Sequence, residues 1–379
     1  MKLGDVCDSV SVTFDKTKQQ VVLINTSDVL EGEVTNHILV DNKGLKGQFK
    51  KTFQKNDILY SEIRPKNRRF AYIDFDSDNY VASTKLMVIR ANNRVLPQYL
   101  YQILKSEKVI NQLQSLAESR SGTFPQITFS ELAQIDVYIP ELSEQKEIAD
   151  FLKLFDDKIE NNKKINHHLA ELIDAQFAHL LEDNELYKST FSEIGEIVGG
   201  GTPSKKVDDY WNGDIPWLSP KDLSLNPAMF TGRGQNSITE LGYKKSSAKL
   251  MPRNSILFSS RAPIGYITIA ENDISTNQGF KSIIPKPEYP YTFVYELLKQ
   301  ETPSLESSAS GSTFKEVSGT HLKNHEIRIP SHSAIIKFHE SVKPLFKTIN
   351  LNEKEIQKLI EVRDLLLPTL MSGEISVSD

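Results

Sequence analysis

Ser121-Gly122-Thr123-Phe124-Pro125-Gln126-Ile127, followed by Asp136-Val137-Tyr138-Ile139-Pro140, closes the first globular part of the sequence. The second half of the chain repeats the pattern as Ser310-Gly311-Ser312-Thr313-Phe314-Lys315-Glu316-Val317, followed by Glu326-Ile327-Arg328-Ile329-Pro330. The pairs that share a separation of 190 residues are Phe124 and Phe314, Leu132 and Leu322, Ile139 and Ile329, and Pro140 and Pro330. A dispersed match that keeps its spacing indicates a tandem duplication within the 379-residue chain.

The similarity extends toward the start of each half. Leu3-Gly4-Asp5-Val6 parallels Ile194-Gly195-Glu196-Ile197. Asn56-Asp57-Ile58-Leu59-Tyr60-Ser61 parallels Asn254-Ser255-Ile256-Leu257-Phe258-Ser259, and each is followed shortly by an arginine, Arg64 or Arg261. The pattern predicts two α/β (α+β) domains in tandem, related as a pseudo-two-fold internal repeat. We place these domains at residues 1–140 and 189–330, with helical tails at 141–188 and 331–379.

Each tail carries a seam of residues at alternating spacings of four and three. The seam positions are Ile148, Leu152, Phe155, Ile159, Asn162 and Leu169 in the first tail, and Leu345, Ile349, Asn352, Ile356, Leu359 and Leu366 in the second. Such a repeat is typical of a coiled coil, so we expect two long antiparallel spacer helices. About 40 residues at 1.5 Å each span roughly 60 Å.

Two asparagines and one proline modify the seam. Asn162 and Asn352 interrupt it at equivalent places, 190 residues apart. A buried Asn pair would fix the register of the helices at a cost in stability, and the alternative is that both side chains face solvent. Pro344 lies inside the second pattern and lacks a backbone donor, so we expect a kink or a helix restart there.

Composition limits the class of protein. Hydrophobic residues make up 39% and charged residues 25%, which is typical of a soluble globular protein. No apolar run reaches the length of a membrane span, the start lacks the apolar core of a signal peptide, and Cys7 is the single cysteine; we therefore expect a cytoplasmic protein. The net charge of −5 argues mildly against nucleic-acid binding, unless basic residues are concentrated on a few surfaces.

Two further stretches resemble a known family. They are Gly199-Gly200-Gly201-Thr202-Pro203-Ser204 with Tyr210-Trp211-Asn212-Gly213-Asp214-Ile215-Pro216-Trp217, and Arg363-Asp364-Leu365-Leu366-Leu367-Pro368-Thr369-Leu370-Met371-Ser372-Gly373-Glu374-Ile375. The first resembles the opening of a target-recognition domain in specificity (S) subunits of Type I restriction–modification enzymes. The second resembles the end of that family's second spacer helix. The order of the parts extends the resemblance over essentially the whole chain.

The resemblance implies a sequence-specific, DNA-binding subunit that carries out no chemistry of its own. Each recognition domain would read one half of a bipartite site on double-stranded DNA, while the spacer helices would set the gap and dock two methyltransferase (M) subunits. The addition of two restriction (R) subunits stays open. S-adenosylmethionine, ATP and Mg²⁺ would belong to these partners, so we expect no cofactor, no metal and no membrane contact in this chain. At about 3.4 Å per base pair, a rod of roughly 60 Å covers at most about 18 base pairs.

Basic residues beside turns are the best candidates for DNA contacts, because arginine can bind a guanine edge with two hydrogen bonds and lysine can neutralise phosphate. In the first domain the candidates are Arg64, Lys66, Arg68, Arg69, Arg120 and Thr123; in the second they are Lys205, Lys206, Lys221, Arg261, Lys281 and Lys315. The alternative for each is a solvated surface charge. Arg64 and Arg261 stand out because they recur at matching places.

Other motifs favour ordinary structural roles. Gly199-Gly200-Gly201 is not followed by the lysine of a phosphate-binding loop. Trp211 and Trp217 could stack on DNA bases, but packing under this Gly-rich segment is favoured. Asp74-x-Asp76-x-Asp78 lacks the glycine and the bidentate acid of a calcium loop, and we expect a polar turn between strands. His167-His168 lacks partners at zinc-binding spacing.

Two other functions stay open. A methyltransferase or nuclease fused to its own recognition module would need an Asn/Asp-Pro-Pro-aromatic segment to hold a flipped adenine, and Asn226-Pro227-Ala228-Met229 departs from that pattern. A coiled-coil adaptor that does not bind DNA would leave the two duplicated domains unexplained.

Overall fold

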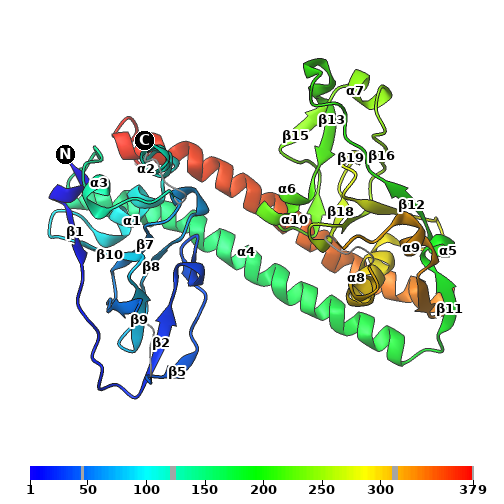
Figure 1. Ribbon diagram of the computed structural model, residues 1–379, viewed down its shortest axis with the longest axis horizontal. Helices are drawn as coiled ribbons and strands as arrows, with labels where there is room; N and C mark the ends of the chain where they lie inside the picture. The colour runs from blue at the N-terminus through cyan, green and yellow to red at the C-terminus, as the bar shows by residue number, and fades with distance from the viewer. Residues whose placement is uncertain (44–46, 120–124, 310–314, 378–379) are drawn as a thin grey trace. The chain divides into compact units, whose positions relative to one another are not determined.

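The computed structural model describes residues 1–43, 47–119, 125–309 and 315–377 (Figure 1). The chain forms two compact units. Unit 1 comprises Met1–Ile159 and Lys358–Asp379, and unit 2 comprises Glu160–Gln357. Two helices of 41 residues, α4 (Leu142–Glu182) and α10 (His332–Ser372), each contribute one part to unit 1 and the other part to unit 2.

Unit 1 contains two four-stranded sheets. The first has the order β1-β10-β7-β8 and is antiparallel throughout; the second has the order β5-β2-β9-β6, in which β2 and β9 are parallel. The strands are β1 (Cys7–Val10), β2 (Gln20–Ile24), β5 (Leu39–Asp41), β6 (Phe49–Lys51), β7 (Ile58–Ser61), β8 (Phe70–Tyr72), β9 (Tyr80–Ser83) and β10 (Leu86–Ala91), with a small ladder of β3 (Val29–Leu30) and β4 (Glu33–Val34). The helices are α1 (Pro97–Lys105), α2 (Glu107–Glu118), α3 (Phe129–Leu132), the first part of α4 and the last part of α10.

Unit 2 is built on the same plan. Its two larger sheets have the orders β12-β20-β17-β18-β14 and β15-β13-β19-β16, in which β14–β18 and β13–β19 are parallel pairs, and β11 and β21 form a separate antiparallel pair. The strands are β11 (Tyr187–Thr190), β12 (Gly195–Gly199), β13 (Trp211–Leu218), β14 (Phe230–Thr231), β15 (Asn236–Ile238), β16 (Leu250–Met251), β17 (Ile256–Ser260), β18 (Ile264–Ala270), β19 (Ile274–Thr276), β20 (Lys281–Pro285) and β21 (Glu326–Ile329). The helices are α5 (Phe191–Ile194), α6 (Pro220–Leu225), α7 (Glu240–Lys244), α8 (Tyr291–Ser307), α9 (Gly319–Asn324) and parts of α4 and α10.

The strand orders confirm the internal repeat. The order β1-β10-β7-β8 corresponds to β12-β20-β17-β18, and β5-β2-β9-β6 corresponds to β15-β13-β19-β16, with the parallel pairs β2–β9 and β13–β19 in the same place. The turn before the central strand also repeats: Asn56 (φ 74°) precedes β7, and Asn254 (φ 69°) precedes β17. Asparagine tolerates this left-handed conformation better than most residues. The predicted α/β fold class is therefore confirmed.

The two long helices complete the core of each unit. In unit 1, Ile148 and Leu152 of α4 share a buried cluster with Leu367 and Leu370 of α10 and with residues of the first sheet. In unit 2, later residues of α4 and earlier residues of α10 do the same. Early α4 thus meets late α10, and late α4 meets early α10, so the helices run antiparallel within each unit. All twelve predicted seam residues are buried or half-buried.

The two asparagines of the seam make cross-helix hydrogen bonds, but not with one another. Asn162 is 2% exposed, and its Nδ2 donates to Glu355 Oε2 at 2.8 Å. Asn352 Nδ2 donates to Asn166 Oδ1 at 2.8 Å. The predicted Asn–Asn pair is therefore wrong, although both side chains link α4 to α10.

Helix α10 continues through Pro344, so a helix restart, one of the two expected effects, is wrong, while a kink at Pro344 stays a prediction. The proline ring is exposed. Proline cannot donate a hydrogen bond to the carbonyl four residues earlier in the helix, and water can bind that carbonyl instead. Packing elsewhere along α10 keeps the chain helical.

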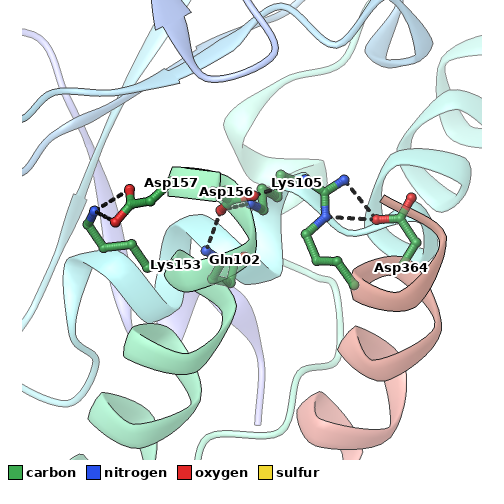
Figure 2. Close-up of polar contacts among 7 residues, drawn as sticks. Gln102, Lys105, Lys153, Asp156, Asp157 and Asp364 are labelled. Atoms are coloured by element: carbon green, nitrogen blue, oxygen red, sulfur yellow. Dashed lines mark hydrogen bonds and ion pairs between the residues drawn. The ribbon is translucent and has the colours of Figure 1, made fainter. Parts of the chain in front are cut away.

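A polar cluster joins α1 to both long helices in unit 1 (Figure 2). Lys105 Nζ lies 2.5 Å from Asp156 Oδ2, and Gln102 Nε2 donates to the same oxygen at 3.3 Å. Arg363 Nη1 lies 2.9 Å from Asp156 Oδ1, and its Nη2 lies 2.8 Å from Asp364 Oδ1. Burial alone would raise the pKa of the Asp156 carboxyl, but the Lys105 and Arg363 cations hold it below its ordinary value. Asp156 is therefore ionised at neutral pH.

In unit 2, α8 is the helix that corresponds to α1, and a different set of polar groups joins it to α4. The segment Tyr295-Glu296-Leu297-Leu298-Lys299 of α8 repeats Tyr101-Gln102-Ile103-Leu104-Lys105 of α1. Lys299 Nζ lies 2.5 Å from Asp174 Oδ1 on α4 and 3.9 Å from Glu296 Oε2. Glutamate thus replaces the glutamine of the first repeat, and burial raises its pKa to about 8.

Among the described residues, no helix combines the length and the apolar character that crossing a bilayer requires.

Candidate nucleic-acid interface

The turn after the central strand β7 carries the first group of predicted DNA contacts. Arg64 adopts a left-handed conformation (φ 45°, ψ 77°), and its backbone N–H donates to Pro125 O at 3.1 Å. Lys66 lies in the short 3₁₀ turn that follows, and its N–H donates to Gln114 Oε1 of α2 at 3.1 Å. Both side chains are exposed. The backbone of the turn is therefore fixed from two sides, while its cations reach solvent.

Arg68 and Arg69 are engaged within unit 1. Arg68 forms an ion pair with Glu107 at the start of α2. Arg69 Nη1 donates to Ser27 O at 2.9 Å and to Val29 O at 3.4 Å. Both side chains are half-buried, so these two guanidinium groups hold the turn in place as structure. Arg120 and Thr123 lie outside the described residues.

The corresponding turn of unit 2 follows β17. Arg261 Nη1 lies 3.5 Å from Glu316 Oε2, and Lys281 Nζ lies 3.4 Å from Glu316 Oε1. Lys315 is the neighbouring residue, and its side chain is exposed. Two predicted contacts from distant parts of the sequence, Arg261 and Lys281, thus meet at one carboxylate.

The repeated backbone positions show that Arg64 and Arg261 are not strict equivalents. Counting from Asn56 and Asn254, the residue that matches Arg64 is Ala262, which is also left-handed (φ 51°). Arg261 therefore stands one position earlier. Left-handed conformations are costly for residues other than glycine, and they are more common where backbone geometry serves function.

The Gly-rich segment of unit 2 presents two further lysines. Trp217 Nε1 donates to Gly201 O at 3.0 Å, and Trp211 Nε1 donates to Ser204 O at 3.1 Å. A Cβ on Gly201 would lie 2.4 Å from the backbone of Ser247, so only glycine fits there. The predicted packing of the tryptophans against this segment is confirmed. The exposed lysines nearby are Lys205 and Lys206, and Lys221 is exposed in the first turn of α6.

Sequence reasoning missed a cation in unit 1. Lys85 Nζ donates to Gln126 Oε1 at 3.2 Å and lies 3.7 Å from Glu62 Oε2. Nearby, Lys51 Nζ donates to the Thr84 carbonyl at 3.2 Å, and burial lowers the pKa of this lysine while the carboxylate of Glu62 opposes the effect. Lys85 lies in the turn between β9 and β10, and the turn residues Thr84 and Lys85 include no Gly, Pro, Asn or Asp that would mark a turn in the sequence.

Two other motifs behave as predicted. Asp74, Asp76 and Asp78 lie in the connection between β8 and β9, which is a polar turn between strands. His167 and His168 are exposed on α4, where both face Glu171. Among the described residues, no group of three or more His, Cys, Asp or Glu side chains is arranged to hold a metal ion.

Comparison with known proteins identifies the family. The family described as "Type I restriction modification DNA specificity domain" matches residues 1–171 and 184–361. The chain is 33% identical to the Type I restriction enzyme HindI specificity subunit of Haemophilus influenzae, over 98% of each chain. It is 43% identical to the MjaIX specificity subunit of Methanocaldococcus jannaschii over 171 residues, which are 45% of this chain and 39% of the relative. A crystal structure of a Type I restriction–modification S subunit from M. genitalium has the same fold, with a TM-score of 0.57 at 17% identity over 98% of this chain and 95% of that one. The protein therefore belongs to the family of Type I restriction–modification specificity subunits.

Proposed function

We propose that this chain reads a bipartite sequence on double-stranded DNA for a Type I restriction–modification complex, and that each unit reads one half-site. The observation that carries the proposal is the repeated strand end. In both units the exit of the central strand presents cations on a turn whose backbone is fixed by the segment after the Ser-Gly motif. Two copies of one recognition surface suit a target with two halves.

The negative net charge is compatible with this proposal, because some buried carboxyl groups do not carry a full negative charge at neutral pH. Burial raises the pKa of Glu296 to about 8 and that of Glu353 to about 7. Glu353 accepts hydrogen bonds from the N–H groups of Met229 and Phe230 at 2.7 and 3.0 Å. Exposed lysines such as Lys206 keep their charge available for phosphate.

The long helices would serve as spacers and as the docking surface for two methyltransferase subunits. Support comes from their equal length of 41 residues and from the antiparallel contacts that they make within each unit. Up to two restriction subunits would complete the complex. In this proposal the chain itself is not catalytic and works in the cytoplasm, and S-adenosylmethionine, ATP and Mg²⁺ are bound by the partner subunits.

The test is methylome sequencing of a methylation-free host that expresses this chain together with a methyltransferase subunit of its own system. We expect methyladenine in a split motif only when both chains are present. A stable complex with an active methyltransferase that leaves the genome unmethylated would contradict the proposal and favour an adaptor.

Exchange of residues 1–140 for another recognition domain tests the division of labour. We expect one half-site to change while the other half-site and the gap stay as they were. A change in both half-sites would contradict reading by separate domains.

Insertion of one matched heptad into α4 and α10 tests the spacer role. We expect the gap to change while both half-sites are preserved, because the recognition surfaces are untouched. An unchanged gap would show that the helices do not set it.

A further inference from the structure

Gln126 and Glu316 occupy the same place in the two units. Each precedes a residue whose backbone N–H bonds to the strand end: Ile127 N donates to Glu62 O at 2.8 Å, and Val317 N donates to Ser260 O at 3.0 Å. Gln126 and Glu316 are also separated by the 190 residues that relate the repeats. The fold therefore places a polar side chain of the same length at the end of β7 in unit 1 and at the end of β17 in unit 2.

A lysine fixes the orientation of each of these side chains. Lys85 Nζ donates to Gln126 Oε1 at 3.2 Å, and Lys281 Nζ donates to Glu316 Oε1 at 3.4 Å. The lysines come from different positions, since Lys85 precedes β10 and Lys281 begins β20. An ammonium group has donors only, so it bonds to one lone pair of the glutamine oxygen, and the second lone pair and the amide NH₂ can both meet a ligand.

The two residues differ in what they can recognise. Gln126 offers a donor beside an acceptor, whereas Glu316, when ionised, offers acceptors only. In the major groove, adenine presents the N6 donor beside the N7 acceptor, which pairs with a glutamine amide through two hydrogen bonds. Cytosine presents the N4 donor, which pairs with a carboxylate.

A purely structural role explains Glu316 poorly. Its side chain is 36% exposed, and its ion pairs with Arg261 and Lys281 are long, at 3.5 and 3.4 Å. Exposed pairs of this kind contribute little to stability. A carboxylate at a surface that must approach phosphate also weakens non-specific attraction, so its presence needs a compensating contact.

We propose that Gln126 and Glu316 are base-reading residues, one for each half-site, and that Gln126 reads an adenine while Glu316 reads a cytosine. The inference rests on the proposed function, because it places both side chains at the DNA-reading face. The lysine beside each one orients the side chain and can contact the neighbouring phosphate. The same position of one fold thus sets one base of each half-site.

The test exchanges the two residue types between the repeats. Glu316→Gln and Gln126→Glu are each expressed with the methyltransferase subunit, and the methylome is sequenced. For Glu316→Gln we expect one cytosine of the unit 2 half-site to become adenine, with the unit 1 half-site unchanged; Gln126→Glu should convert one adenine of the other half-site to cytosine. Glu196→Gln, an exposed glutamate on β12, makes the same charge change and should leave the motif as it is.

Binding of the complex to DNA duplexes measures how strongly each base is preferred. The wild-type complex should prefer the cytosine duplex over its adenine variant by about tenfold, and Glu316→Gln should reverse that order. An unchanged motif in both variants would overturn the inference while leaving the proposed function intact. Loss of discrimination at that G·C pair, with no new preference for adenine, would mean that Glu316 only positions Arg261, which also overturns it. If the wild-type complex methylates no split motif, the proposed function itself is contradicted.

Discussion

Arg363 Nη1 lies 2.9 Å from Asp156 Oδ1, and this ion pair between α10 and α4 has no charged counterpart in unit 2. The residues 190 positions away are Ile173 and Phe346, and both are fully buried in the core of unit 2. The same docking position is therefore filled by a charge pair in one repeat and by an apolar pair in the other. A buried ion pair is weak evidence for stability, since desolvation offsets most of the attraction, but removing one partner leaves a charge uncompensated.

We expect Asp156→Ala to lower the free energy of unfolding by about 2 kcal/mol, because Lys105 and Arg363 then lose their shared carboxylate. The double variant Asp156→Phe/Arg363→Ile copies the apolar pair of unit 2 and releases Asp364 from Arg363, so that Asp364 can pair with Lys105 as its counterpart Asp174 pairs with Lys299; it should recover most of the loss. Urea unfolding followed by circular dichroism measures both. Lys146→Ala removes the exposed Lys146–Asp150 pair and should change nothing measurable. A double variant no more stable than Asp156→Ala would contradict the equivalence of the two docking positions.

The pH dependence of stability should depend on Glu296. Burial and, to a smaller extent, the neighbouring Asp174 raise its folded pKa from an ordinary 4.5 to about 8, while the Lys299 cation opposes the rise. The folded state thus holds a proton that the unfolded state releases, so stability falls as pH rises from about 4.5 to about 8.

Glu296→Gln removes this titration and places in α8 the residue that α1 carries as Gln102. We expect the variant to be more stable than the wild type at pH 8, by about 1–3 kcal/mol, with the difference shrinking toward pH 5. Thermal unfolding across that range measures it. A constant difference at all pH values would show that packing, and not ionisation, separates the two proteins.

The sequence predicted the repeat because equivalent residues kept their spacing, and it predicted the long helices because the seam is periodic. It could not predict the order of the strands, since spacing shows that two segments correspond but not which strands pair. Phe346 was missed for a related reason. The heptad pattern selects Leu345, whereas Phe346 is fully buried by ring contacts with Phe230, Tyr291 and Tyr295 of the domain.

The candidate site was predicted less completely than the fold. Exposed lysines beside turns could be named from composition and turn signals alone. The contact of Lys85 with Gln126 spans 41 residues, and that of Arg261 with Glu316 spans 55. Such contacts depend on the tertiary fold, so no local pattern distinguishes them from Arg69, whose guanidinium group bonds to backbone carbonyls within unit 1.

Salt dependence should separate phosphate contacts from base contacts. Lys205→Ala/Lys206→Ala removes two exposed cations beside the Gly-rich segment, and we expect weaker binding to every duplex with a salt slope smaller by about two. The methylated motif should stay the same. Fluorescence anisotropy of the complex at a series of salt concentrations measures the slope. Lys153→Ala, which removes an exposed lysine paired with Asp157 on α4 (Figure 2), should leave it unchanged. An altered motif with an unaltered slope would assign these lysines to bases instead.

Arg64 should show opposite effects on stability and on DNA binding. Its φ of 45° is unfavourable for a residue with a side chain, so Arg64→Gly should raise the free energy of unfolding by about 0.5 kcal/mol while weakening DNA binding. Ala262→Gly is the matched control in unit 2, because Ala262 has a φ of 51° and carries no charge. We expect the same small gain in stability from that variant with DNA binding unchanged. Urea unfolding and duplex binding of both variants decide the matter: equal binding by Arg64→Gly and the wild type would mean that the strained turn serves only the fold, and the contact assigned to Arg64 would then have to be withdrawn.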